Sequence, residues 1–182
     1  MMASESEEAR PESALLSSDE CFMAHCLIVA QQSKDPNTQV GACVVDVKGS
    51  ILGSGYNKMP NGCESLPWSR NHKHRDHETV LYTKYPYVCH AVLNAIISSK
   101  GGVEGGTVYT TLFPCYECAK LIIQSGIKKV VYFTDRYEED TESQGARKLF
   151  ETAEIDHIEF SGLKDLVIDF TNPRTPLKFM RE

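Results

Sequence analysis

The sequence has no long apolar run and no recognisable export signal. No stretch approaches the roughly 18–20 apolar residues that a membrane-spanning helix needs. The N-terminal residues are acidic and rich in serine, without the basic-then-apolar order of a signal peptide. We therefore expect a cytoplasmic protein with no membrane partner, and a nuclear share is also compatible with the sequence.

The sequence also lacks a cluster of basic residues. The formal net charge is −6, and no dense block of Lys and Arg occurs. Proteins that bind long nucleic acids usually carry a clustered basic surface, because neutralising phosphates supplies most of their affinity. The acidic total therefore favours a small substrate over polymeric nucleic acid.

The sequence also lacks an even number of cysteines, which a complete set of disulfides would need. The chain has seven, and an odd number without an export signal argues against a disulfide framework. Most are expected to be small buried hydrophobes. Cys115 and Cys118 are the exception, because their spacing lets both sulfurs bind one metal ion.

The length and composition are those of one ordinary globular domain. The 182 residues are 41% hydrophobic and 24% charged, enough for a sizeable core. We expect a disordered leader over residues 1–18, one domain over 19–170 and a loosely ordered tail over 171–182.

Helical and strand-like segments alternate along the domain. Helices are expected over residues 19–32, 89–99, 115–125 and 142–153, and strands over 40–46, 50–56, 107–112, 129–134 and 157–160. Asp19 is a candidate N-cap for the first helix. This alternation predicts a layered α/β domain whose sheet is covered on both faces.

Three residues form a candidate metal site. His90 lies 25 residues before Cys115, and Cys118 shares a helix face with Cys115 at i+3. Two thiolates and one imidazole suit zinc and leave a fourth position for water, as in catalytic sites. A lone Cys-x-x-Cys is also compatible with a redox pair or with two core cysteines. Here the Cys-x-x-Cys pair occurs together with His90 at the start of another predicted helix, and this combination favours zinc.

The same residues match a known signature. Zinc deaminases carry His-x-Glu, a spacer and Pro-Cys-x-x-Cys, in which the Glu carries protons and does not bind the metal. Here the sequence reads His-Ala-Val at 90–92 and Pro-Cys-Tyr-Glu-Cys at 114–118. Over about residues 19–170 it resembles the cytidine and deoxycytidylate deaminase family, and the deoxycytidylate branch in particular. The segments that carry this likeness are 33–37, 39–42, 59–63, 83–90 and 119–128.

The resemblance implies a fold, a reaction and a cofactor. The fold would be a three-layer α-β-α, cytidine-deaminase-like arrangement with a mixed five-stranded sheet. The reaction would be hydrolysis of dCMP to dUMP, with one Zn²⁺ per subunit on His90, Cys115 and Cys118. Homo-oligomers, commonly hexamers, would be expected.

The resemblance also implies ligand contacts. Asn57 would contact the sugar, and the backbone of Ala91 would hydrogen-bond the pyrimidine edge. The effectors dCTP and dTTP would bind near Gly55, Tyr56 and Lys58. Lys58 departs from the family, which usually has glycine there. If that position needs a positive φ, lysine costs about 1 kcal/mol or more and counts against effector binding.

A second departure, Val92, stands where the family has its glutamate. Deamination at C4 of cytosine needs a group that takes a proton from water and delivers it to N3 and to the leaving amine. Valine has no ionisable atom, and Glu117 lies on a helical position that points away from the ligand face. Because general acid–base catalysis is typically worth 10²–10⁴-fold, turnover is expected to fall by at least about three decades while zinc and nucleotide binding survive.

Several other residues have two interpretations. His72, His74 and His77 suit a second zinc or a solvated polar loop, and the loop is favoured. Tyr137 follows a predicted strand and suits either substrate contact or plain packing. The acidic run over 138–142 is expected to be solvated surface.

Two other functions compete with an impaired deaminase of a pyrimidine monophosphate. One is a catalytically silent, nucleotide-binding partner that regulates active subunits, which Val92 favours. The other is a deaminase of tRNA or single-stranded DNA, which the acidic balance disfavours.

Overall fold

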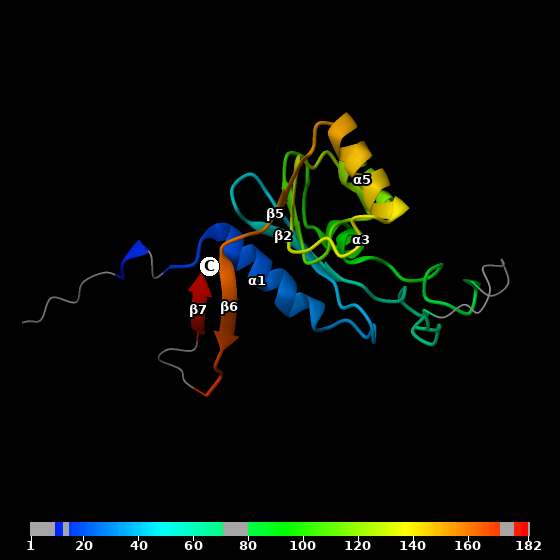
Figure 1. Cartoon of the computed structure of the whole chain (residues 1–182), viewed down its shortest axis with the longest axis horizontal. Coiled ribbons are helices and arrows are strands. Elements are labelled where there is room, and N and C mark those ends of the chain that lie inside the picture. The colour runs from blue at the N-terminus through cyan, green and yellow to red at the C-terminus, as the bar shows by residue number, and fades with distance from the viewer. Residues whose placement is uncertain (1–9, 13–14, 71–79, 172–176, 182) are drawn as a thin grey trace, which may run out of the picture.

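A mixed five-stranded sheet forms the centre of the protein (Figure 1). The computed structural model describes residues 10–12, 15–70, 80–171 and 177–181. The helices of this part are α1 (Ser18–Ala30), α3 (Ala91–Ser98), α4 (Tyr116–Gln124) and α5 (Thr141–Thr152). The strands of the sheet are β1 (Gly41–Val45), β2 (Ile51–Tyr56), β3 (Thr107–Thr110), β4 (Lys129–Tyr132) and β5 (Asp156–Glu159). The predicted alternation of helices and strands is confirmed.

The sheet has the order β2-β1-β3-β4-β5. β1 runs antiparallel to both β2 and β3, whereas β3, β4 and β5 are parallel and alternate with α4 and α5. The carboxyl ends of β3 and β4 therefore lie at one edge of the sheet. Ligand sites of α/β sheets commonly form at such an edge.

Alternating side chains of the strands supply two cores. In β1, Ala42 and Val44 face one core, while Cys43 and Val45 face the other, as the two-residue period of a strand requires. The first core packs against α3, α4 and α5, and the second packs against α1. The sheet is thus covered on both faces, and the predicted three-layer fold is confirmed.

Two glycines of β2 let α3 lie against the sheet. A Cβ on Gly55 would come within 2.4 Å of the Ala95 nitrogen and 2.6 Å of the Ala91 oxygen, and one on Gly53 would meet the Ala95 oxygen at 2.5 Å. These are backbone atoms, so α3 would have to move. Gly55 therefore helps to set the position of the N-terminal end of α3.

The start of α1 differs from the prediction. Ser17, not Asp19, is the N-cap: its hydroxyl accepts from the Glu20 amide at 3.2 Å, and the Glu20 carboxylate accepts from the Ser17 amide at 2.6 Å. This reciprocal pair is a capping box. Asp19 instead accepts a hydrogen bond from the Tyr109 hydroxyl.

A second, two-stranded sheet follows the domain. β6 (Leu163–Ile168) and β7 (Leu177–Arg181) pair antiparallel, although the sequence predicted no regular structure after Asp169. Arg181 of β7 forms an ion pair with Glu20 of α1 at 2.7 Å. No helix in the described part of the chain is long and apolar enough to cross a membrane.

Candidate metal and nucleotide site

A cavity of about 450 Å³ opens where the predicted metal ligands meet. Its wall includes His90, which caps the N-terminus of α3, and Cys115, which caps the N-terminus of α4. Cys118 joins them from the first turn of α4. Small-molecule sites usually have about 300–1,000 Å³, so the cavity has the size of a small-molecule site.

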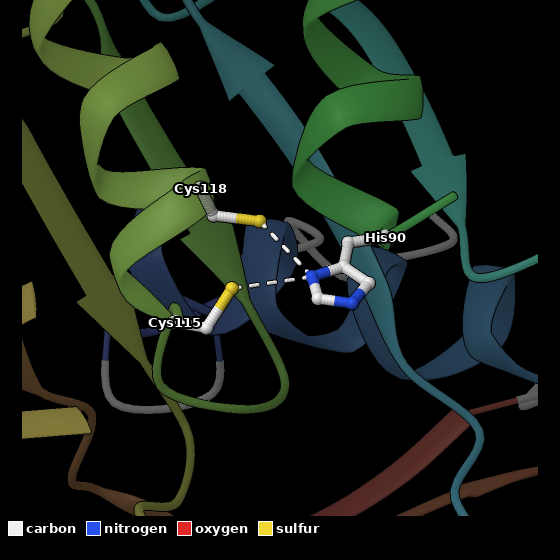
Figure 2. A group of neighbouring side chains, drawn as sticks. All are labelled: His90, Cys115 and Cys118. Atoms are coloured by element: carbon white, nitrogen blue, oxygen red, sulfur yellow. Dashed lines mark hydrogen bonds between the residues drawn. The ribbon is translucent and has the colours of Figure 1, made fainter. Parts of the chain in front are cut away.

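The three side chains converge on one point (Figure 2). The Nδ1 atom of His90 lies 3.3 Å from the Cys115 sulfur and 3.4 Å from the Cys118 sulfur. All three ligand atoms lie within 4.8 Å of one another. Among the described residues, this is the cluster that the geometry offers for a metal.

These distances fit a tetrahedral zinc ion. Zn–S bonds of about 2.3 Å and Zn–N bonds of about 2.0–2.1 Å at a tetrahedral angle place sulfur and nitrogen about 3.5 Å apart. The donor set of two sulfurs and one nitrogen is also one that zinc prefers. Because the three ligands line the cavity wall, a fourth position is left on the cavity side.

The protonation of the cluster also suits a cation. A hydrogen bond with Cys118 lowers the pKa of the Cys115 thiol, and His90 lowers it further, although burial opposes both. The same bond with Cys115 raises the pKa of Cys118, and burial adds to that rise. The cluster thus holds one thiolate readily before any metal arrives, and a metal would favour the second.

Val92 occupies the first turn of α3, two residues after His90. The residue is 3% exposed, lines the cavity and packs in the core that lies under α3, α4 and α5. Val92 therefore lines the same cavity as the metal cluster and offers it only an aliphatic side chain.

Comparisons with known proteins agree with this site. The family model described as the cytidine and deoxycytidylate deaminase zinc-binding region matches residues 16–134. The deoxycytidylate deaminase of Homo sapiens is 50% identical over 155 residues, covering 83% of this chain and 84% of the relative. The probable deoxycytidylate deaminase of Drosophila melanogaster is 40% identical over 171 residues, covering 92% and 84%.

The chain belongs to the cytidine and deoxycytidylate deaminase family.

A solved structure supports the same fold. The dCMP deaminase of the cyanophage S-TIM5, in complex with dCMP and dUMP, matches this deaminase-family chain with a TM-score of 0.62 and 25% identity. The match covers 84% of this chain and all of that one. A zinc cofactor accords with the family, and His90, Cys115 and Cys118 are its candidate ligands.

Asn57 lies in the wall of the deaminase cavity, with its carboxamide already engaged. Its Nδ2 donates to the Thr38 carbonyl at 2.9 Å and to the Asp35 carboxylate at 3.2 Å, and its Oδ1 accepts from the Val40 amide at 2.8 Å. Both amide hydrogens are therefore used within the protein. Only the second lone pair of Oδ1 remains for a ligand.

A buried ion pair that no sequence motif indicated lies beside Asn57. Asp35 is 1% exposed and Lys84 is 7% exposed, and their charged groups are in contact. Burial raises the pKa of Asp35, but the Lys84 ammonium and the backbone amides of Asn37 and Thr38 outweigh it and lower that pKa. No sequence motif links residues 49 positions apart, so this pair appears only in the fold.

Ala91 and Tyr137 both line the cavity, as their predicted roles require. Ala91 is the first residue of α3, so its backbone N–H has no acceptor within the helix. The Tyr137 hydroxyl accepts from Arg70 at 3.3 Å.

The predicted effector residues Gly55, Tyr56 and Lys58 lie outside the cavity wall. Lys58 has no positive φ, so the strain that a lysine would suffer there does not arise. Its ammonium donates to the Asn61 side chain at 2.9 Å.

Two predictions about acidic residues have different outcomes. Glu117 pairs with Lys120 at 2.6 Å, is exposed and does not line the cavity, which confirms that it points away. By contrast, Asp140 and Glu142 are exposed but do line the cavity, so the run over 138–142 is not merely solvated surface. Burial, and then the nearby Cys115, raise the pKa of Glu142.

His72, His74 and His77 lie outside the described residues.

Proposed function

We propose that this chain binds dCMP in the zinc cavity and hydrolyses it to dUMP only very slowly, because Val92 has replaced the proton carrier. The match to the human and insect relatives and the metal cluster support the substrate class. The single observation that carries the low turnover is Val92, a buried aliphatic side chain in the cavity wall next to the metal cluster.

The reaction exchanges the amine on C4 of the pyrimidine for the oxygen of water and releases ammonia. When bound, zinc supplies Lewis-acid activation of water near neutral pH. His90, Cys115 and Cys118 hold that metal, and the free N–H of Ala91 donates to the pyrimidine edge. Asn57 meets the sugar as an acceptor, because both of its amide hydrogens are already bonded.

Proton transfer is the step that this chain lacks. Water must give one proton to N3 and a second proton to the departing amine, and a carboxylate beside the metal can carry both in turn. Val92 cannot accept a proton, Asp35 is fixed by Lys84, and Glu117 faces solvent. Asp140 and Glu142 are the described carboxylates that line the cavity outside the ion pairs found there, and the charge of Glu142 interacts with Cys115 and His90, so any residual transfer is assigned to Glu142.

The test is a joint assay of binding and turnover with zinc-loaded wild-type protein. Calorimetry should detect dCMP binding, while dUMP formation should stay below about 0.01 s⁻¹, three decades under the typical enzyme median of about 10 s⁻¹. Glu142→Gln should reduce any residual rate. Turnover at an ordinary enzyme rate, or a failure to bind dCMP, would contradict the proposal.

A second function, favoured by Val92, is that of a silent partner in a homologous assembly. In this proposal the chain binds nucleotide, joins active subunits in an oligomer of the expected hexamer type and alters their response to dCTP and dTTP. The test mixes this chain with an active deoxycytidylate deaminase and measures the effector response of the mixture. An unchanged response and no co-migration on gel filtration would reject this role.

A further inference from the structure

The ion pair between Asp35 and Lys84 lies in the cavity wall, although neither charge takes part in the proposed reaction. The Asp35 side chain is completely buried, and the Lys84 side chain is 9% exposed. Removing two charges from water costs free energy that well-packed hydrophobic residues of similar volume would not cost. A buried pair in this place is therefore weak evidence for stability and points to another role.

Asp35 organises the loop that follows it. Its Oδ1 accepts from the backbone amides of Asn37 at 2.9 Å and of Thr38 at 3.2 Å, as in an Asx turn. The Thr38 carbonyl of this turn accepts from the Asn57 Nδ2 at 2.9 Å. The Oδ2 of Asp35 accepts from the same Nδ2 at 3.2 Å and from the Lys84 ammonium. Both acceptors of the Asn57 amide group thus depend on Asp35.

These contacts favour one orientation of the Asn57 carboxamide. If the group were turned over, its oxygen would face the Asp35 carboxylate and the Thr38 carbonyl. Its NH₂ would face the Val40 amide, which now donates to Oδ1 at 2.8 Å. Each contact would then pair two acceptors or two donors, so none could form a hydrogen bond. The charge on Asp35 strengthens this preference, because hydrogen bonds to ionised groups are stronger than those between neutral groups.

Lys84 connects this network to the segment that leads to His90. The Lys84 carbonyl accepts from the Tyr87 amide at 3.1 Å and from the Val88 amide at 2.9 Å. The ammonium that holds Asp35 therefore comes from a hydrogen-bonded turn and not from a free chain. Asp35 is fixed from two sides, by its own loop and by the turn before the metal cluster.

We propose that Asp35 and Lys84 are positioning residues that hold the Asn57 carboxamide as a hydrogen-bond acceptor, so that the cavity selects a sugar with a hydroxyl that can donate to it. Both amide hydrogens of Asn57 are engaged, so Asn57 can accept from a ligand through Oδ1 but not donate to it. The sugar of dCMP has a single free hydroxyl, on C3′, which is therefore the group that is read. This inference rests on the proposed binding of dCMP.

The test compares dCMP with 2′,3′-dideoxycytidine 5′-monophosphate, which lacks the C3′ hydroxyl, in calorimetric titrations of zinc-loaded protein. The wild type should bind dCMP about three- to tenfold more tightly, the usual worth of one hydrogen bond between neutral groups. Asp35→Asn leaves one oxygen for the donors of Asn37, Thr38, Asn57 and Lys84. Its preference for dCMP should fall to within about twofold, because the Asn57 carboxamide is no longer fixed.

Two further variants separate positioning from folding. Asn57→Ala should remove the preference directly. Asp46→Asn is the matched control: Asp46 also accepts from two backbone amides in a turn, those of Lys48 and Ser50, but it does not line the cavity. Its preference should equal that of the wild type. Zinc content and circular dichroism establish that each variant is folded, and a general loss of structure would weaken both ligands without changing their ratio.

The double variant Asp35→Asn, Lys84→Gln keeps the test available if the single variant does not fold. Asp35→Asn alone leaves a buried ammonium without its partner, which is strongly destabilising, whereas the double variant removes both charges. The double variant should also lose the preference for dCMP. The one remaining oxygen at position 35 cannot serve both the loop amides and Asn57.

Four results would overturn the inference. A preference that survives in Asp35→Asn or in the double variant, but not in Asn57→Ala, would show that Asn57 needs no positioning. An equal loss of affinity for both ligands in Asp35→Asn would show a purely structural role. A preference that survives in Asn57→Ala, or is absent from the wild type, would show that Asn57 does not read the hydroxyl. Wild-type protein that binds neither ligand would instead reject the proposed function itself, together with this inference.

Discussion

At the residue scale, the site depends on three ligand atoms and one missing carboxylate. His90 and Cys115 are N-caps of two different helices, and Cys118 follows one turn into the second. The convergence of Cys115 and Cys118 follows from a local rule, because a cap and an i+3 position share one helix face. His90 joins them because α3 and α4 pack over the same core. Under our proposal, Val92 changes the chemistry of the site and not its architecture, since an apolar side chain fits the core under α3.

Loss of one ligand should abolish tight metal binding. Cys115→Ser leaves one thiolate and one imidazole, so zinc affinity should fall by more than the 10–100-fold that is typical of losing an outer-shell partner. Competition with a chromophoric chelator measures this affinity. Cys21→Ser is the control, because Cys21 is exposed on α1. If both variants bound zinc like the wild type, the assigned ligand set would be wrong.

At the element scale, the position of α3 decides where His90 and Val92 lie. That position depends on the close approach that Gly53 and Gly55 permit between β2 and the backbone of α3. Glycines in a predicted strand indicate such an approach. The sequence alone could not say which helix uses it.

Gly55→Ala should therefore destabilise the fold and loosen the site. Its Cβ would overlap the backbone of α3, and overpacking of this kind typically costs about 1–3 kcal/mol of unfolding free energy. Zinc affinity should fall as well. Urea denaturation and metal titration measure the two effects. Gly102→Ala is the matched control, because a Cβ at Gly102 meets nothing within 4 Å; equal stability of the two variants would contradict the packing argument.

The attachment of β7 to α1 predicts a pH dependence. The Arg181 hydrogen bond lowers the pKa of Glu20 from 4.5 to about 2, although burial opposes it. A carboxyl whose pKa is lower in the folded state stabilises the fold above its unfolded pKa and loses that contribution as the pH falls toward its folded pKa.

Arg181→Gln should thus be less stable than the wild type above about pH 5, and the difference should shrink as the pH falls toward 2. Urea denaturation at a series of pH values measures this. Lys120→Gln, at the exposed pair with Glu117, should change stability little at any pH. A difference for Arg181→Gln that does not vary with pH would exclude Glu20 as its cause.

Sequence patterns located most elements of the domain and the metal cluster, because periodicity, caps and ligand spacing are local. They missed the Asp35–Lys84 pair and the position of Glu142, which depend on how distant segments meet. They also missed β7, whose short strand follows two prolines, and placed the first N-cap at Asp19 because several residues there can cap. The described structure contains none of His72, His74 and His77, so the preference for a solvated polar loop over a second zinc stays a prediction.

At the scale of the whole molecule, the acidic total conceals a cavity with a cationic side. The chain carries a net charge of −6, yet Arg70 faces a cavity whose other wall is acidic. Among the described residues, the cavity wall offers no array of cations of the kind that a nucleic-acid polymer needs, which favours a small ligand.

The most direct test of the account compares kcat for dCMP in the wild type, Val92→Glu and Val92→Gln, each loaded with zinc. Glutamate should raise kcat about 10³-fold, within the range for general acid–base catalysis, while glutamine, which has similar volume and no titratable proton, should leave it low. A wild-type rate equal to that of Val92→Glu would contradict the account. So would a Val92→Glu protein that binds zinc and dCMP without turning the nucleotide over.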